Sequence, residues 1–289
     1  MKKNLLICFD AFGTIFTPRR PIFEQYGEAA RDLGLSGFTD EQVASSFKKA
    51  FKYESKINPN YGRATGLGAA KWWTNIIHNT FEPLIAGSGQ DIPEKLAPTL
   101  LHRFSSKEGY RVFEDAYAYL RKHSKSSDHA KGATGRTVIG VITNSDDRVP
   151  DILSSLDVKV SNVRHGTPIR DYITNHPSPD DKPDIDFAIM SYDVGFEKPH
   201  RRVFDAATDV LKNLLSAEGQ AEPSLEDWAL VYVGDEVEKD ARGSLDAGWD
   251  AILMDREGQY GTAEEEHPGV VVLKDFNELS LLQEKYPSI

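Results

Sequence analysis

Several segments of this 289-residue chain place reactive polar side chains directly after, or shortly after, short apolar runs. These side chains are Asp10, Thr143, Lys198, Asp235 and Asp240. Apolar runs of five or so residues are typical of strands buried on both faces of a parallel sheet. In an open α/β sheet, ligands bind beyond the carboxyl ends of the strands. The pattern therefore predicts one pocket that collects residues distant in sequence.

The residue types at these positions indicate a metal and an anion. Asp10, Asp235 and Asp240 would repel one another unless a cation lay between them, and an oxygen-only ligand set suits Mg²⁺. The Lys198 ammonium and the Thr143 hydroxyl are the donors that a phosphoryl or other anionic group needs opposite such a metal. Each aspartate also has a structural interpretation on its own, because aspartate commonly caps a turn or the following helix.

The amino-acid composition limits the kinds of partner and the cellular compartment that are expected for this protein. The formal net charge of −11 argues against nucleic acid and anionic membrane surfaces, so a small-molecule substrate is expected. Cys8 is the single cysteine, which excludes a disulfide framework and fits a reducing compartment. The apolar run near Met1 is too short for a signal peptide or a membrane span. We predict a cytoplasmic protein and leave access to the nucleus open.

Strands and helices alternate in the part of the chain that carries these residues. Strands are predicted near residues 5–9, 138–142, 187–190, 230–233, 251–254 and 270–273, the last at an edge. Helices are predicted near 149–156, 201–215 and 277–285. Alternation of this kind predicts a mostly parallel sheet with right-handed crossovers.

A run of helices interrupts this alternation early in the chain. Helices are predicted near 21–33, 39–51, 68–81 and 93–104, with no strand among them before about residue 136. Thr39 and Gln42 form a capping box at the second of them. Trp72 and Trp73 cannot both face one side of a helix, so at least one is expected in the core of this insert. The fold class is therefore α/β: a Rossmann-like, mostly parallel sheet domain, 1–17 and 110–289, with an inserted α-helical domain, 18–109.

Two polar stretches without periodicity, 124–135 and 161–184, are predicted to be surface loops. The second contains His165 and His176, whose spacing matches no metal-ligand pattern. A solvated loop is therefore the favoured interpretation.

The ordered motifs resemble those of a known family. Asp10-x-x-Gly13-Thr14, Thr143-Asn144, Lys198-Pro199 and Gly234-Asp235-(four residues)-Asp240 are similar to the four motifs of the haloacid dehalogenase superfamily. The helical insert resembles the cap of its subfamily I. Arg19-Arg20-Pro21, residues 58–62 and Trp72-Trp73 resemble the branch of the rhythmically expressed gene 2 protein and haloacid dehalogenase-like hydrolase domain-containing protein 3. The resemblance covers nearly the whole chain apart from the polar stretches.

The resemblance implies a role for each motif. Asp10 would be the nucleophile that forms an aspartyl ester, and Thr143 and Lys198 would bind the transferred anionic group. Asp10, the backbone carbonyl of Phe12 and Asp235 would hold Mg²⁺, with Asp240 in support. Further contacts to a phosphorylated substrate are expected from Thr14, Asn144, Arg19, Arg20 and Arg63.

One position departs from the phosphatase pattern. Phosphatases of this superfamily usually carry a second aspartate two residues after the nucleophile, and here that residue is Phe12. Loss of such a general acid costs about 10²- to 10⁴-fold in rate. An aromatic residue there resembles the metal-independent 2-haloacid dehalogenases, which generally lack the acidic pair Asp235 and Asp240. Three functions remain open: a weakened Mg²⁺-dependent phosphohydrolase, a non-catalytic ligand- or protein-binding homologue, and a dehalogenase.

Overall fold

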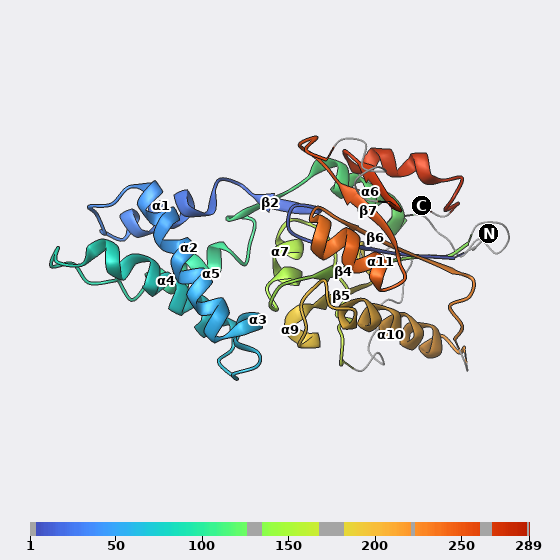
Figure 1. Cartoon of the computed structure of the whole chain (residues 1–289), viewed down its shortest axis with the longest axis horizontal. Helices are drawn as coiled ribbons and strands as arrows, with labels where there is room; N and C mark the ends of the chain where they lie inside the picture. The colour runs from blue at the N-terminus through green and yellow to red at the C-terminus, as the bar shows by residue number, and fades with distance from the viewer. Residues whose placement is uncertain (1–3, 126–134, 168–181, 221–222, 261–267, 288) are drawn as a thin grey trace. The chain divides into compact units, whose positions relative to one another are not determined.

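The computed structural model describes residues 4–125, 135–167, 182–220, 223–260, 268–287 and 289. Its centre is a six-stranded sheet in the order β5-β4-β1-β6-β7-β8, in which every paired strand is parallel to its neighbour (Figure 1). The strands are β1 (Asn4–Phe9), β4 (Thr137–Thr143), β5 (Phe187–Met190), β6 (Trp228–Gly234), β7 (Asp250–Met254) and β8 (Val270–Leu273). The predicted parallel α/β sheet is confirmed, with β8 at an edge.

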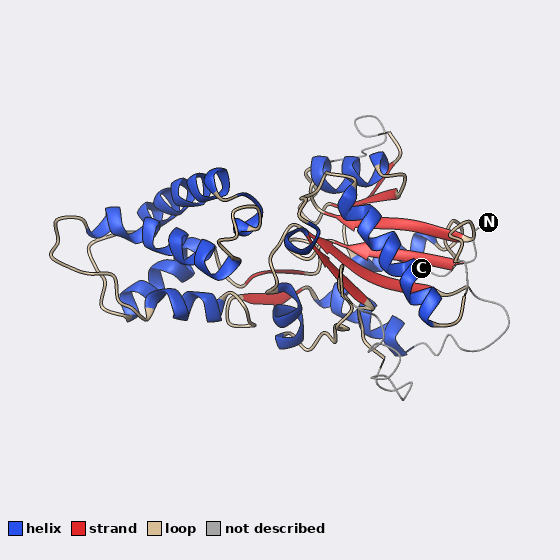
Figure 2. Cartoon of the chain, turned by 90° about the horizontal axis from the view of Figure 1, so that it is seen from below, coloured by secondary structure: helices blue, strands red, loops and turns tan. Residues whose placement is uncertain are grey.

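Both faces of β1 are covered. Leu6 and Cys8 belong to a buried cluster that includes residues of α10 (Arg202–Ala217) on one face. Phe9 points to the other face, where its ring centroid lies 5.7 Å from that of Tyr119 in α6 (Glu114–Lys125) and 5.1 Å from that of Phe276 in η3 (Phe276–Leu282). Helices on both faces of the sheet are visible in Figure 2. A strand buried on both faces needs apolar side chains in both orientations, which explains the unbroken apolar run of β1.

The chain divides into two compact units. One, here the sheet unit, comprises Met1–Thr17, Val112–Asn144 and Asp157–Ile289, and the other, the helical unit, comprises Pro18–Arg111 and Ser145–Leu156. The sequence predicted a helical insert of residues 18–109 alone. The structure adds α7 (Val149–Ser155) and the turn before it to the helical unit.

The helical unit is built around an aromatic core. Its helices are α1 (Ile22–Asp32), α2 (Asp40–Ile57), α3 (Pro59–Gly62), α4 (Ala69–Ile85), α5 (Leu96–Arg103) and α7. The predicted capping box opens α2: the Thr39 side chain accepts a hydrogen bond from the Gln42 backbone, and the Gln42 side chain accepts one from the Thr39 backbone. Trp72 is 2% exposed, and the half-buried Trp73 packs against its cluster, as expected for the core of the insert.

Some elements differ from those predicted. Two strands of three residues, β2 (Phe16–Pro18) and β3 (Tyr110–Val112), pair with each other, although no strand was expected between the helices. The last helix is a 3₁₀ helix, and η2 (Val237–Arg242) before α11 (Gly243–Asp246) is a π-helix. Three-residue strands are too short for a periodic pattern, and helix subtype depends on local hydrogen bonding that composition does not encode.

Two further predictions concern loops and membranes. Residues 126–134 and 168–181, which include His176, lie outside the described residues; His165 is half-buried. No helix in the described ranges has both the length and the apolar character needed to cross a bilayer.

Candidate active site

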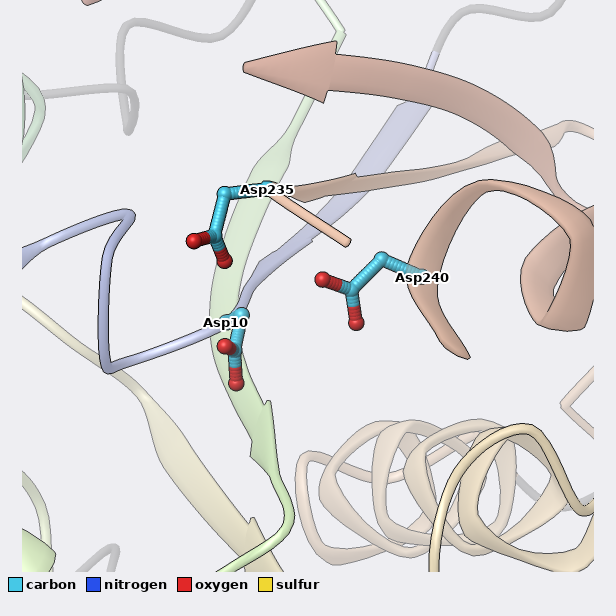
Figure 3. Close-up of side chains that lie close together, drawn as sticks. All are labelled: Asp10, Asp235 and Asp240. Carbon is cyan, nitrogen blue, oxygen red and sulfur yellow. The ribbon is translucent and has the colours of Figure 1, made fainter. Parts of the chain in front are cut away.

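Sheet register places two of the predicted aspartates side by side. Phe9 at the end of β1 is paired with Val233 of β6, and the Asp10 amide donates to the Val233 carbonyl at 2.8 Å. Asp235 directly follows β6, so both carboxylates leave the same edge of the sheet. Asp240 joins them from η2, and ligand oxygens of the three carboxylates all lie within 4.8 Å of one another (Figure 3). The sequence prediction that these residues meet at one edge agrees with this geometry.

Two glycines make room for these carboxylates. A Cβ atom at Gly13 would stand 2.0 Å from Oδ2 of Asp235, and one at Gly234 would stand 2.3 Å from Oδ2 of Asp240. Gly13 also has a φ of 78°, in the left-handed region that glycine adopts at low cost. The tight turn after β1 and the position of Asp235 therefore depend on the missing side chain at Gly13.

Lys198 is held among the acidic groups by three acceptors. Its Nζ donates to Oδ1 of Asp10 at 2.9 Å, to Oδ1 of Asp240 at 2.7 Å and to the hydroxyl of Tyr232 at 2.7 Å. An ammonium has three N–H groups, so all of them are used by the protein. Lys198 is 4% exposed, and it is therefore a fixed positive charge between two of the three carboxylates.

The backbone of Lys198 is fixed by Asn144. The Asn144 side-chain oxygen accepts from the Lys198 amide at 2.6 Å, and its side-chain nitrogen donates to the Lys198 carbonyl at 3.0 Å. Both ends of the Asn144 amide are thus engaged with Lys198, whereas the sequence suggested a substrate contact. The reason is the pairing of β4 with β5, which brings the loops after these two strands together. Asn144 acts here as the group that positions Lys198.

The electrostatics of the site follow from burial and the excess of negative charge. Burial alone would lower the pKa of Lys198, but the carboxylates of Asp10 and Asp240 outweigh it and raise that pKa above its ordinary value. Burial raises the pKa of Asp10, although Lys198 and a hydrogen bond with Thr143 oppose this change. Burial, followed by the charges of Asp10 and Asp240, raises the pKa of Asp235 from 3.8 to about 7.

The two carboxylates that follow β6 have different surroundings. Asp240 is committed on both oxygens, because Oδ1 accepts from Lys198 and Oδ2 accepts from the Glu236 amide at 2.9 Å. Asp235 has no ion-pair partner among the residues that the structure describes. Three carboxylates therefore share one ammonium. Because such oxygen ligands suit a hard divalent cation, the residues present fit Mg²⁺, with Asp10 and Asp235 best placed to hold it and Asp240 anchoring Lys198.

The other predicted site residues lie as follows. Thr143 ends β4 and is hydrogen-bonded to Asp10. Thr14 is fully buried, and its hydroxyl has no hydrogen-bond partner among the described residues. Phe12 is half-buried, with its ring centroid 4.7 Å from that of Phe16. Ligation by the Phe12 carbonyl stays a prediction.

The three arginines expected at the substrate all belong to the helical unit and are exposed. Arg19 donates from Nε to the Lys107 carbonyl at 2.6 Å, and Arg20 pairs with Glu28 at 2.6 Å. The role of Arg19, Arg20 and Arg63 in binding substrate stays a prediction.

Comparison with known proteins places this chain in a family. A family model described as a haloacid dehalogenase-like hydrolase matches residues 5–248. The chain belongs to the haloacid dehalogenase-like (HAD) hydrolases. It is 29% identical to an uncharacterized hydrolase of Schizosaccharomyces pombe, over 88% of this chain and 92% of that protein. It is 28% identical to haloacid dehalogenase-like hydrolase domain-containing protein 3 of Mus musculus (86% and 81% covered) and to the rhythmically expressed gene 2 protein of Drosophila melanogaster (86% and 82% covered).

Solved HAD structures share the fold at low sequence identity. A HAD hydrolase, YfnB, of Bacillus subtilis, bound to magnesium, has a TM-score of 0.55 and 15% identity, covering 98% of this chain and 100% of that one. A 2-haloacid dehalogenase of Pseudomonas syringae and a HAD phosphatase of Thermococcus onnurineus each have a TM-score of 0.53 and 18% identity, covering 99% of both chains. The fold is therefore common to phosphatases and dehalogenases and does not distinguish them.

Sequence reasoning missed Tyr232. Its hydroxyl accepts from Lys198 Nζ and donates to the Ile142 carbonyl at 2.8 Å, one residue before Thr143. In the sequence this tyrosine belongs to an apolar run and is expected to be a core residue, and it is fully buried. A phenol inside a strand that ends at a charged site was the available signal, because buried tyrosine hydroxyls require a partner.

Proposed function

We propose that this HAD hydrolase is a Mg²⁺-dependent phosphohydrolase that acts on a small phosphorylated metabolite through an aspartyl-phosphate intermediate. The observation that carries the proposal is the acidic group of Asp10, Asp235 and Asp240, which shares the single ammonium of Lys198. A divalent cation would balance that charge and attract the phosphoryl oxygens. A reaction that needs no metal gives no reason to place Asp235, which has no ion-pair partner among the described residues, beside the nucleophile.

In the first step, one residue attacks phosphorus and two others orient it. The Asp10 carboxylate attacks phosphorus, a new oxygen–phosphorus bond forms, and the bond to the leaving group breaks with its electron pair. Lys198 holds Oδ1 of Asp10 at 2.9 Å, and Thr143 is hydrogen-bonded to the same carboxylate, so the nucleophile is oriented before substrate arrives. Water then attacks phosphorus, the bond between phosphorus and Asp10 breaks with its electron pair to restore the carboxylate, and inorganic phosphate leaves while the water gives up a proton to solvent.

Phe12 limits which substrates can react. No carboxyl group is available at this position to protonate the departing oxygen, so an alkoxide leaves slowly. Phenolates and carboxylates depart as stable anions and need no proton. We therefore propose a preference for aryl or acyl phosphates over alkyl phosphates.

Binding of the rest of the substrate is assigned to the remaining predicted residues. The buried hydroxyl of Thr14, which finds no hydrogen-bond partner in the described part of the chain, supports its role as a contact to the phosphorylated ligand or to bound water. The helical unit is proposed as the cap that selects the substrate, with Arg19, Arg20 and Arg63 as its anion contacts. The acidic chain and its single cysteine support a cytoplasmic, small-molecule enzyme.

The aromatic residue at position 12 favours a second candidate, a non-catalytic homologue that binds a phosphorylated ligand or a protein without turnover. A third candidate is a metal-independent 2-haloacid dehalogenase, in which Asp10 displaces halide without acid catalysis.

The deciding experiment is hydrolysis of p-nitrophenyl phosphate with saturating Mg²⁺, by the wild type and Asp10→Asn, each with a chelator control. Turnover that requires both the metal and Asp10 supports the proposal. Release of halide from a 2-haloacid in the presence of chelator would support the dehalogenase instead. Phosphate binding with no turnover in either assay would leave the binding protein.

A further inference from the structure

A buried charged group in the helical unit lies on the same turn as two residues of the candidate active site. Asp146 is fully buried, and it follows Thr143 and Asn144 by three and two residues. Arg148, whose side chain is 14% exposed, pairs with it: Nε lies 2.9 Å from Oδ1 and 3.2 Å from Oδ2. The Arg148 backbone amide also donates to Oδ1 at 3.1 Å, so Asp146 fixes the turn that opens α7.

Trp73 of α4 completes this group. Its indole Nε1 donates to Oδ2 of Asp146 at 2.6 Å, and the Arg148 guanidinium carbon lies 4.5 Å from the centroid of its ring. Both carboxylate oxygens of Asp146 are therefore occupied, one of them by a side chain 73 positions earlier in the chain. Hydrogen bonds to a buried carboxylate are among the stronger ones in proteins. The neighbouring Trp72 directs its indole N–H elsewhere, because its Nε1 donates to the Asn58 carbonyl at 2.8 Å, while its ring packs edge-on against that of Trp73 at a centroid distance of 4.8 Å.

The segment from Thr143 to Arg148 is thus held at both ends. At one end Thr143 and Asn144 contact Asp10 and Lys198 in the sheet unit. At the other end Asp146 and Arg148 are bound to α4 of the helical unit. Since only Ser145 separates Asn144 from Asp146, a shift of Asp146 changes the backbone that sets the direction of the Thr143 and Asn144 side chains.

We propose that Trp73 is a positioning residue: through its hydrogen bond to Asp146 it sets the turn that aims Thr143 at Asp10 and Asn144 at Lys198. In this proposal the influence of α4 on the nucleophile passes through the continuous backbone of residues 143–148. This inference rests on the proposed function only for its kinetic consequence. The mechanical link between Trp73 and the turn stands independently.

The test compares hydrogen–deuterium exchange of the backbone amides of residues 144–149 in the wild type and two variants at position 73. Trp73→Phe removes the N–H donor, and benzothienylalanine at position 73 keeps the bicyclic shape but replaces the N–H by sulfur. Benzothienylalanine at position 72 is the matched control, since it removes an indole hydrogen bond from the same helix and keeps the bicyclic ring that packs against Trp73. Substitution of Asp146 is avoided, because it would leave Arg148 buried without its carboxylate.

Both position-73 variants are expected to accelerate exchange in this segment by about tenfold or more, the size expected for losing a hydrogen bond to a charged group. Benzothienylalanine at position 72 is expected to leave it unchanged. The Arg148 amide, which donates to Asp146, is the most direct reporter. Unchanged exchange in both position-73 variants, or equal acceleration with benzothienylalanine at position 72, would overturn the proposal.

Kinetics give the second readout. With p-nitrophenyl phosphate and Mg²⁺, Trp73→Phe should lower kcat by about tenfold to a hundredfold, as for a misplaced catalytic group, with KM within twofold of the wild type. A rise in KM with kcat unchanged would assign Trp73 to substrate binding and overturn the positioning role. If the wild type does not hydrolyse the substrate, the proposed phosphohydrolase fails, and the exchange experiment alone decides the role of Trp73.

Discussion

Replacement of Gly13 by alanine should weaken or abolish Mg²⁺ binding while the protein still folds. A methyl group at Gly13 would stand 2.0 Å from Oδ2 and 2.6 Å from Cγ of Asp235, so this carboxylate must retreat by about 1 Å or more to reach ordinary contact distance. Metal sites tolerate ligand displacements of only about 0.2 Å. Asp235 would therefore be lost as a ligand, and the Kd for Mg²⁺ should rise by at least about tenfold.

Gly195→Ala provides the matched control. Gly195 has a φ of 84°, close to the 78° of Gly13, but a Cβ atom there meets nothing within 4 Å. Both variants bear the cost of alanine in the left-handed region, about 1–2 kcal/mol, offset by about 0.4–1 kcal/mol from the reduced entropy of the unfolded chain. Urea denaturation should give both a similar free energy of unfolding, because the atom that obstructs the new methyl group is the end of a side chain.

The assay is calorimetric titration with MgCl₂ at pH 8, where Asp235 is largely ionised. The wild type and Gly195→Ala are expected to bind Mg²⁺ with similar affinity. Gly13→Ala is expected to bind Mg²⁺ weakly or not at all. Binding by Gly13→Ala within twofold of Gly195→Ala would refute the placement of Asp235 on the metal. No binding by the wild type would refute the metal site itself.

Three further predictions address the proposed chemistry. Phe12→Asp supplies the missing acid and should raise hydrolysis of alkyl phosphates by about tenfold or more relative to aryl phosphates; an equal change for both classes would contradict the role given to Phe12. Tyr232→Phe leaves one N–H of Lys198 unpaired, so it should lower the free energy of unfolding in urea by about 1–3 kcal/mol and also lower kcat. A variant with wild-type stability and wild-type kcat would show that the phenol does not position Lys198. The pKa of Asp235 is raised from 3.8 to about 7 in the metal-free native state. Between these two pH values the native Asp235 carboxyl therefore keeps a proton that the same carboxyl has lost in the unfolded chain. The metal-free protein should therefore lose stability as pH rises toward 7, while Mg²⁺ affinity increases over the same range and then levels off; affinity independent of pH between 5.5 and 8.5 would contradict this.

Much of the local structure could be predicted from the amino-acid pattern alone. The apolar runs at 187–190 and 270–273 are strands at those same residues. The first is buried along its whole length, which demands continuous apolar side chains, and the second lies at the sheet edge with its two middle residues half-buried. The capping box at Thr39 is equally local, because its partners are three residues apart. The order of the polar residues that follow the strands also sufficed to predict that Asp10, Asp235 and Asp240 meet, because parallel strands bring their carboxyl ends to one edge.

The atoms that these residues contact could not be predicted from local patterns, because they depend on how the elements pack. From the sequence, Tyr232 is expected to be a core residue and Asn144 a substrate contact. In the folded chain the strand order brings both residues to Lys198. The bond from Trp73 to Asp146 joins positions far apart in sequence, and no local pattern encodes it. Periodicity reports which side chains are buried, because burial repeats with the geometry of each element. The partner that a buried polar group finds depends on how distant elements pack, and that is settled only when the chain folds.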